Sequence, residues 1–195
     1  MENYKGVKTF YAKTRNDWRK WLTENHLKEK SVWLIIYKKK LKISSIYYPE
    51  AVDEALCFGW IDSVPNKKDE NSYYQFFSKR NPKSNWSKVN KEKANQLIKQ
   101  GLMQKAGFEA IKISKENGTW TALDDVENLV VPNDLLNLFL TNLTAKQNWD
   151  NFPRSSKRGI LEWILNAKKE ETRQKRIEET VSLAEKNIKA NQYKK

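Results

Sequence analysis

WIDSVPNKKDENSYYQFFSKR (residues 60–80) is the stretch that decides the fold of the N-terminal part. Two runs rich in aromatic and β-branched residues, 60–64 and 72–80, flank the polar segment PNKKDEN. Aromatic and β-branched residues favour strands, whereas Pro, Asn and Asp favour turns. The stretch therefore predicts a β-hairpin, which sets two neighbouring strands of an antiparallel sheet.

The residues before this hairpin predict one more strand and two helices. SVWLIIYKKK (31–40) begins with a run that is apolar on both faces, as in a central strand. Thr14 is an N-cap for a helix over 15–26, whose tryptophans recur at helical spacing. YPEAVDEALCFG (48–59) predicts a short helix that ends at the C-cap Gly59. The predicted order is thus α-β-α-β-β.

Helical periodicity dominates after residue 82. An Asn90-capped helix ending at Gly101 is followed by helices over 104–117, 133–141, 144–152 and 157–187, the last broken near 166–169. We predict an α+β fold: a small, mostly antiparallel three-stranded sheet with helices, followed by an all-helical C-terminal part. The predicted domains are 1–89 (α+β) and 90–195 (helical), with the second closely packed on the first.

Composition points to a basic protein without disulfides. The 195 residues carry a net charge of +13, and residues 72–115 alone hold ten basic and two acidic side chains. Such a field attracts anionic small molecules or polyanions. One cysteine excludes an intramolecular disulfide. The longest apolar run, residues 32–37, is far shorter than the ~20 residues of a membrane helix, and the N-terminus lacks a signal-peptide core. We expect a cytoplasmic protein with no membrane span.

Residues with catalytic chemistry are few. Cys57 lies at the C-terminal end of its predicted helix with two acids one turn back, which disfavours a thiolate, so we interpret it as a packed residue. His26 is the only histidine, and a structural zinc site needs about four Cys or His ligands. No phosphate-binding glycine loop is present. We expect no metal and no cofactor, and no reaction is indicated.

The loop NPKSNWSK (81–88) gives the best binding hypothesis. Free N–H groups at a helix start bind anions, and the flanking cations add charge. Trp86 either stacks on a ligand ring or anchors the loop to the core. Asp62 either pairs with Lys79 or Arg80, or orients a ligand. The predicted ligand-binding residues are Trp60, Asp62, Arg80, Lys83, Asn85 and Trp86.

Three motifs resemble a known family. They are DEALCFGWIDS (53–63), FFSKRNPKSNWSKVNKEKANQLIKQGLMQKAGFEAI (76–111) and ILEWILNAKKEETRQKRIEETVSLAEKN (160–187). Together they look like the YdeI/OmpD-associated family, also labelled bacteriocin-protection proteins, over nearly the whole chain. The resemblance implies an α+β N-terminal part and a helical C-terminal part that carries AKKEETRQKRI. It also implies a role in resistance to antimicrobial peptides or a link to a porin, and it supplies no catalytic residue.

Three functions follow as hypotheses. The first is a non-enzymatic binding or stress-protection protein that uses its basic-aromatic surface for an anionic ligand or a protein partner. The second is an enzyme acting on a small anionic substrate in a pocket between the two parts. The third is a nucleic-acid-binding protein, which the charge supports and no motif does.

Overall fold

The computed structural model describes residues 2–191, which form two compact units. Unit 1 comprises the residues up to Thr121, and unit 2 begins at Ala122. The predicted boundary was 89/90. The helices that immediately follow it therefore belong with the sheet of unit 1, because their apolar faces pack into the core of that unit.

Unit 1 contains a five-stranded sheet and four helices. The elements in chain order are β1 (Asn3–Tyr4), β2 (Val7–Tyr11), α1 (Arg15–Asn25), β3 (Ser31–Tyr37), α2 (Tyr48–Cys57), β4 (Trp60–Lys67), β5 (Ser72–Lys79), α3 (Lys88–Lys99) and α4 (Lys105–Glu116). The predicted α-β-α-β-β order is confirmed for α1 to β5. Thr14 caps α1 in a capping box, as predicted, whereas α3 is capped by Ser87 and not by Asn90.

The sheet has the strand order β1-β2-β3-β5-β4, with β3 in the centre as predicted. The prediction of three strands is wrong, because β1 and β2 add a hairpin at one edge, and β2 pairs with β3 in parallel. These strands escape prediction because β1 has two residues and β2 is interrupted by the exposed Lys8. Their turn is Lys5-Gly6, with both residues at positive φ.

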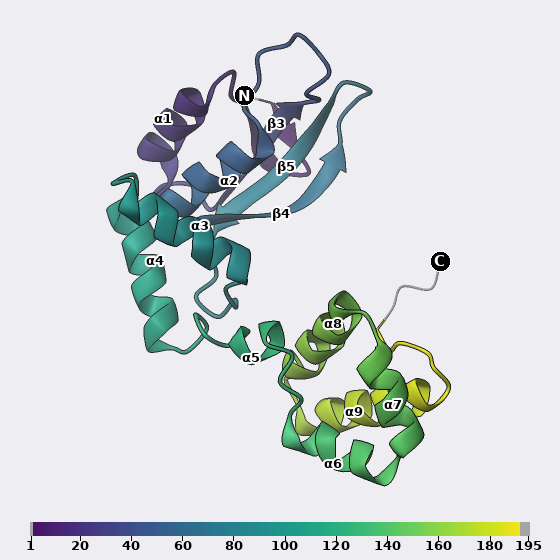
Figure 1. The fold of residues 1–195 in the computed structure, drawn as a ribbon. Coiled ribbons are helices and arrows are strands. Elements are labelled where there is room, and N and C mark those ends of the chain that lie inside the picture. Colours follow the sequence, from purple (N-terminus) through teal and green to yellow (C-terminus); the bar gives the residue numbers. More distant parts are fainter. Residues whose placement is uncertain (1, 192–195) are drawn as a thin grey trace. The chain divides into compact units, whose positions relative to one another are not determined.

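The core of unit 1 lies between one face of this sheet and its helices (Figure 1). Alternate residues of β3 and β5 point into it, and the fully buried side chains include Trp18, Trp60, Phe77 and Trp86. Each aromatic side chain of this size buries ~150–250 Å², which at ~25 cal/mol per Å² makes them the largest single contributors to the hydrophobic stabilisation of the unit.

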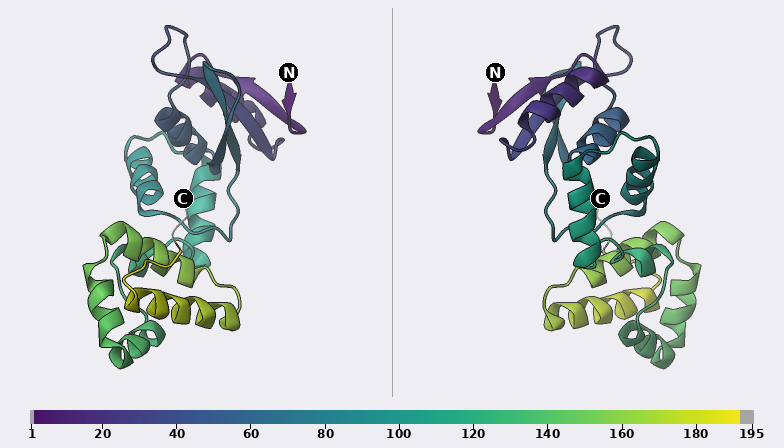
Figure 2. Two further views of the ribbon diagram at one scale, coloured as in Figure 1. Left: turned by 90° about the vertical axis from the view of Figure 1, so that its right-hand side faces the viewer. Right: turned by 90° about the vertical axis from the view of Figure 1, so that its left-hand side faces the viewer.

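Unit 2 is all-helical, as predicted for the C-terminal region. Its elements are α5 (Asp124–Glu127), α6 (Asn133–Thr141), α7 (Leu143–Asn151), α8 (Arg154–Leu165) and α9 (Glu170–Glu185). The long helix is broken between α8 and α9, as predicted, and α9 packs on α6, α7 and α8 around a separate apolar core (Figure 2). Within residues 2–191, no helix has the length and apolar composition needed to cross a membrane.

Candidate functional site

Two glycines bring α4 close to the end of α2. Gly59 has a φ of +71° and directs the chain from α2 into β4. A Cβ at Gly59 would lie 2.7 Å from the Ala106 carbonyl oxygen, and one at Gly107 would lie 2.5 Å from the Cys57 oxygen. The backbone of α4 therefore lies directly against the backbone at the end of α2. Only glycine leaves room for this contact at the two positions.

The loop that follows β5 is fastened to the other end of α4. The Trp86 amide donates to the Thr119 carbonyl at 3.1 Å, and the Asn117 side-chain amide donates to the Pro82 carbonyl at 2.8 Å. The Arg80 amide donates to the Gly59 carbonyl at 3.0 Å, which ties the end of β5 to the start of β4. The loop therefore has a fixed position relative to the helix.

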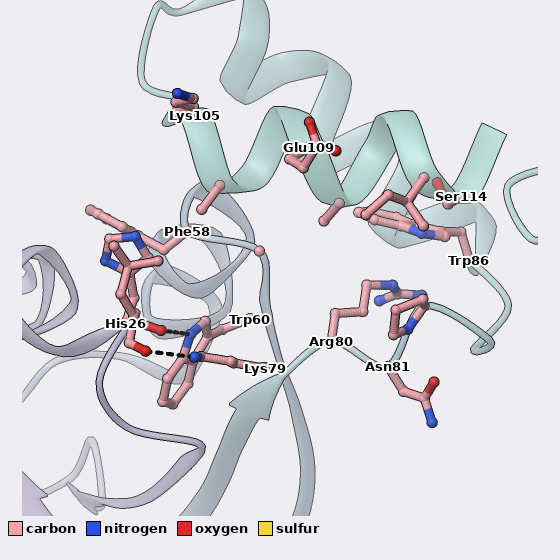
Figure 3. A pocket seen from close by; sticks show the side chains of 16 residues that line it. His26, Phe58, Trp60, Lys79, Arg80, Asn81, Trp86, Lys105, Glu109 and Ser114 are labelled. Atoms are coloured by element: carbon pink, nitrogen blue, oxygen red, sulfur yellow. Dashed lines mark hydrogen bonds between the residues drawn. The ribbon is translucent and has the colours of Figure 1, made fainter. Parts of the chain in front are cut away.

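A cavity of about 700 Å³ lies between α4, the loop and the adjoining ends of β4 and β5 (Figure 3). All of its lining residues belong to unit 1. Its smallest lining residues are Ala106 and Ala110 of α4 and Gly59. The remaining lining residues are aromatic and aliphatic side chains together with about as many polar or charged ones: His26, Leu27, Phe58, Trp60, Lys79, Arg80, Asn81, Pro82, Trp86, Lys105, Glu109, Ile113 and Ser114.

Arg80 is the most unusual charged group of the cavity. Its guanidinium carbon lies 3.9 Å from the Trp86 ring centroid, and one Nη donates to the Asn85 carbonyl at 2.6 Å. Within residues 2–191 it has no carboxylate partner, and its Nε is buried without a hydrogen bond, as is Trp86 Nε1. Burial lowers the pKa of Arg80 from its ordinary value to about 10. At neutral pH the cavity thus holds a poorly compensated cation.

The opposite end of the cavity is lined by His26 and Leu27, which directly follow α1. His26 lies beside Phe58, with ring centroids 5.1 Å apart. Trp60 Nε1 donates to the His26 carbonyl at 3.3 Å, and Lys79 Nζ donates to the Leu27 carbonyl at 2.8 Å (Figure 3). These bonds fix the backbone of this segment against β4 and β5.

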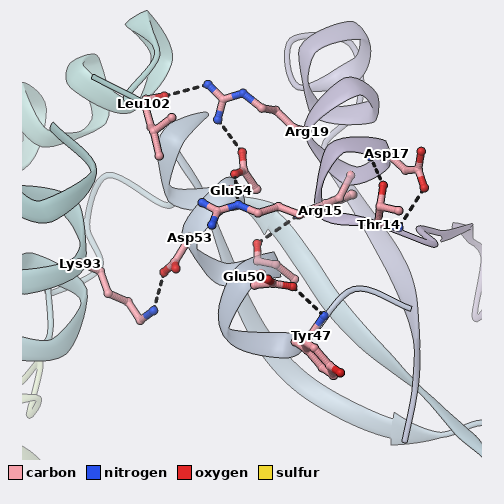
Figure 4. Close-up of polar contacts among 12 residues, drawn as sticks. Thr14, Arg15, Asp17, Arg19, Tyr47, Glu50, Asp53, Glu54, Lys93 and Leu102 are labelled. Carbon is pink, nitrogen blue, oxygen red and sulfur yellow. Dashed lines mark hydrogen bonds and ion pairs between the residues drawn. The ribbon is translucent and has the colours of Figure 1, made fainter. Parts of the chain in front are cut away.

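The other buried charges of unit 1 are compensated (Figure 4). Glu54 is 2% exposed and pairs with Arg15 and Arg19, at 2.6 Å each. Arg19 also donates to the Leu102 carbonyl at 2.9 Å, and Asp53 pairs with Lys93. This network joins α1, α2 and α3 to the segment before α4, and it has a structural role.

Cys57 is a packed residue, as predicted. Its side chain is fully buried, and burial together with the charge of Glu54 raises the pKa of the thiol to about 11. Among residues 2–191, no group of three or more His, Cys, Asp or Glu side chains is arranged to hold a metal ion.

Three of the six predicted ligand-binding residues line the cavity: Trp60, Arg80 and Trp86. Asn85 contributes its carbonyl to Arg80 from outside the lining. Lys83 is exposed on the loop and does not line the cavity.

Asp62 also lies outside the lining. It accepts a hydrogen bond from the Tyr48 hydroxyl at 2.6 Å, and burial together with this bond raises the pKa of Tyr48. The interpretation of Asp62 as an ion-pair partner of Lys79 or Arg80 is therefore wrong.

Sequence reasoning missed the α4 wall and the His26–Phe58 end. The sequence does contain a pattern that predicts the close packing of α4. Ala106, Gly107 and Ala110 place small residues on one side of this helix, as a close contact requires. His26 had no such pattern, since a histidine at the end of a helix is most often a simple terminus residue.

Family comparisons match two separate stretches of the chain. Residues 10–110, just over half of the chain, match the model described as domain of unknown function DUF8412. Residues 128–187 match the model described as bacteriocin-protection, YdeI or OmpD-associated. That match covers the third of the three motifs, whereas the first two fall almost wholly in the stretch matched by the other model. No curated protein and no solved structure matches the chain. The chain belongs to the DUF8412 family through residues 10–110 and carries a YdeI/OmpD-associated, bacteriocin-protection domain at residues 128–187.

Proposed function

We propose that unit 1 binds a small organic anion with an apolar body in the cavity beneath α4. The observation that carries this proposal is the Arg80 guanidinium, which faces the cavity, is largely withdrawn from water and has no carboxylate partner within residues 2–191. A carboxylate or similar group of a ligand would supply the missing countercharge.

The energetics favour a ligand with both features. A buried cation without a countercharge costs several kcal/mol, whereas a charge-assisted hydrogen bond contributes about 1.5–3 kcal/mol. The apolar lining between the polar groups adds ~25 cal/mol for each Å² of ligand surface removed from water. A purely inorganic anion would leave that lining unused, and a neutral apolar molecule would leave Arg80 unpaired.

The dimensions favour a small molecule over a polymer. A volume of about 700 Å³ is within the ~300–1,000 Å³ of small-molecule sites. Nucleic acids are held chiefly by exposed cations that track the phosphate backbone, whereas Arg80 is half-buried beneath Trp86. Binding, with no chemical step, is therefore the function that this site supports best.

A thermal-shift comparison of an acid with its neutral analogue tests the proposal. We expect 2-naphthoate to raise the Tm of the protein by ~5 °C at 100 times its Kd, because that excess stabilises the native state by ~2.7 kcal/mol. The amide 2-naphthamide, which has the same body and no charge, should give a much smaller shift.

Two variants assign the effect to Arg80. Arg80→Met removes the charge and should abolish the naphthoate shift, while the unliganded Tm stays equal or rises because a buried cation is lost. Lys83→Gln removes a neighbouring charge outside the cavity and should keep the shift. Equal shifts for acid and amide, or an undiminished naphthoate shift in Arg80→Met, would count against the proposal.

A further inference from the structure

We infer that the ligand carries a hydrogen-bond donor, such as a hydroxyl or N–H group, at the end remote from its anionic group, and that His26 Nε2 accepts this hydrogen bond. The inference rests on the proposed function, since it concerns the same cavity. It narrows the ligand from any apolar anion to a flat acid with a donor at its far end.

The protonation of the His26 ring follows from its one hydrogen bond. Nδ1 lies 2.8 Å from the Leu22 carbonyl oxygen. A carbonyl oxygen only accepts, so Nδ1 must carry the proton. In the neutral ring Nε2 then has a lone pair and accepts a hydrogen bond. Within residues 2–191 the side chain makes no other hydrogen bond, so Nε2 is available to a ligand.

The position of His26 places this acceptor away from Arg80. Figure 3 shows His26 and Phe58 at one end of the cavity and Arg80 with Trp86 at the other, with α4 extending above both. The lining of the cavity also includes small residues, among them Gly59 and Ala110. A flat ring system fits such a surface, with polar groups only at its two ends.

The other polar side chains at the His26 end either donate hydrogen bonds to backbone carbonyls already or carry a charge. Trp60 Nε1 and Lys79 Nζ both donate to backbone carbonyls. Lys105 is a donor and cannot accept. Glu109 is the one other side-chain acceptor that lines this part of α4, and its carboxylate points away from Arg80 in Figure 3. His26 Nε2, which makes no hydrogen bond within residues 2–191, is therefore the acceptor that we assign to the donor of the ligand.

Three naphthoates separate a donor from an acceptor at the same position. In 6-hydroxy-2-naphthoate the far end donates, in 6-methoxy-2-naphthoate it only accepts, and 2-naphthoate has neither group. Titration calorimetry of the full chain should show the hydroxy acid binding ~3–10-fold more tightly than the methoxy acid, the range expected for one neutral hydrogen bond.

His26→Phe keeps an aromatic ring beside Phe58 and removes Nε2. In this variant the hydroxy-to-methoxy ratio should fall to about one, while the ratio of 2-naphthoate to the methoxy acid, neither of which donates a hydrogen bond, should stay as in the unmodified protein. Glu109→Gln removes the competing carboxylate and should leave the ratio in place.

The outcomes distinguish the inference from the proposed function. Equal affinities for the hydroxy and methoxy acids, with both dependent on Arg80, would overturn the inference and leave the proposed function standing. A preference lost in Glu109→Gln and retained in His26→Phe would move the acceptor to Glu109 and also overturn it. If no naphthoate bound the unmodified protein, the proposed function itself would be contradicted.

Discussion

Two charged side chains of unit 1 differ in how their charge is compensated. Glu54 is almost fully buried, and two guanidinium groups hold both of its oxygens. Arg80 is also withdrawn from water, and its hydrogen-bond partner is a neutral carbonyl. Because proteins normally pair a buried charge, this uncompensated one, which faces a cavity, is the reason that we propose a ligand site there.

Cys57 gives a prediction at the scale of a single residue. Burial and the charge of Glu54 raise the pKa of its thiol to about 11, above the ~8.5 of a free cysteine. The native protein should therefore react with Ellman's reagent at pH 8 only through unfolding, whereas in guanidinium chloride one thiol should react at once. Prompt labelling of the native protein would show that the thiol is accessible.

The same raised pKa sets the sign of a pH effect. Between about pH 8.5 and 11 the unfolded thiol loses its proton while the native thiol keeps it, so the native state binds more protons. The stability contributed by Cys57 is therefore lost as the pH rises through this window. Cys57→Ser should make the decline above pH 8.5 shallower in urea titrations.

At the scale of elements, α4 depends on its contact with α2. The Gly107 position leaves no room for a methyl group, since a Cβ would lie 2.5 Å from the Cys57 oxygen and 2.8 Å from the Leu56 oxygen. Both are backbone atoms, which move only if the helix moves. Gly107 therefore fixes how closely α4 approaches α2, although it does not line the cavity itself.

Gly107→Ala should lower the free energy of unfolding by ~1–3 kcal/mol, the usual cost of overpacking, despite the better helix propensity of alanine. Urea denaturation followed by circular dichroism measures it. Gly159→Ala is the matched control, because Gly159 is also in a helix and a Cβ there meets nothing within 4 Å. That change should be neutral or stabilising by up to ~1 kcal/mol. Equal effects of the two substitutions would refute the close contact.

Two arginines of the basic motif at the start of α9 make contacts within unit 2. Arg173 pairs with Asp134 of α6 through two hydrogen bonds of 2.7 and 3.0 Å. Arg176 donates to the Trp163 carbonyl and lies over its ring at 4.9 Å. These contacts fasten α9 to α6 and α8.

The Asp134–Arg173 pair predicts a pH dependence. The hydrogen bonds from Arg173 lower the pKa of Asp134, so its stabilising contribution is complete above the ordinary Asp value near 3.9 and is lost as the pH falls below it. At pH 6 Asp134→Asn should lower the free energy of unfolding by ~1 kcal/mol, since the pair is partly exposed. At pH 2.5 the difference from the unmodified protein should be smaller than at pH 6, because Asp134 is then increasingly protonated.

The control for this pair is Asp150→Asn. Asp150 is exposed and pairs with Lys146 on the surface of α7, so its loss should change stability by less than ~0.5 kcal/mol at either pH. An Asp134→Asn effect of the same size at pH 6 and pH 2.5 would be inconsistent with a titrating ion pair.

At the scale of the whole molecule, the sequence predicted those elements whose signals are local. The capping box at Thr14, the central strand over VWLIIY and the break before α9 were all predictable, because each depends on neighbouring residues. Strands β1 and β2 were not, because β1 has only two residues, which form a strand through pairing with β2, and β2 is a five-residue run interrupted by Lys8 that pairs with the distant β3.

The candidate site likewise combines residues that local sequence signals predict with residues that only tertiary contacts bring together. Trp60, Arg80 and Trp86 were predictable as a group because they flank one hairpin and its exit loop. His26 and α4 reach the cavity through tertiary contacts, including the backbone approach at Gly107, which no local pattern encodes. Asp62 was misassigned because the sequence does not show that Tyr48, on the first turn of α2, supplies its partner.

A crystal structure with 6-bromo-2-naphthoate tests the central claim most directly, because bromine is located by its anomalous scattering. We expect one bromine site in the cavity between α4 and the ends of β4 and β5, with the carboxylate within ~3 Å of a nitrogen of Arg80. No bromine should occupy the cavity in Arg80→Met crystals grown under the same conditions. Bromine found only outside the cavity, or a carboxylate turned away from Arg80, would contradict the account.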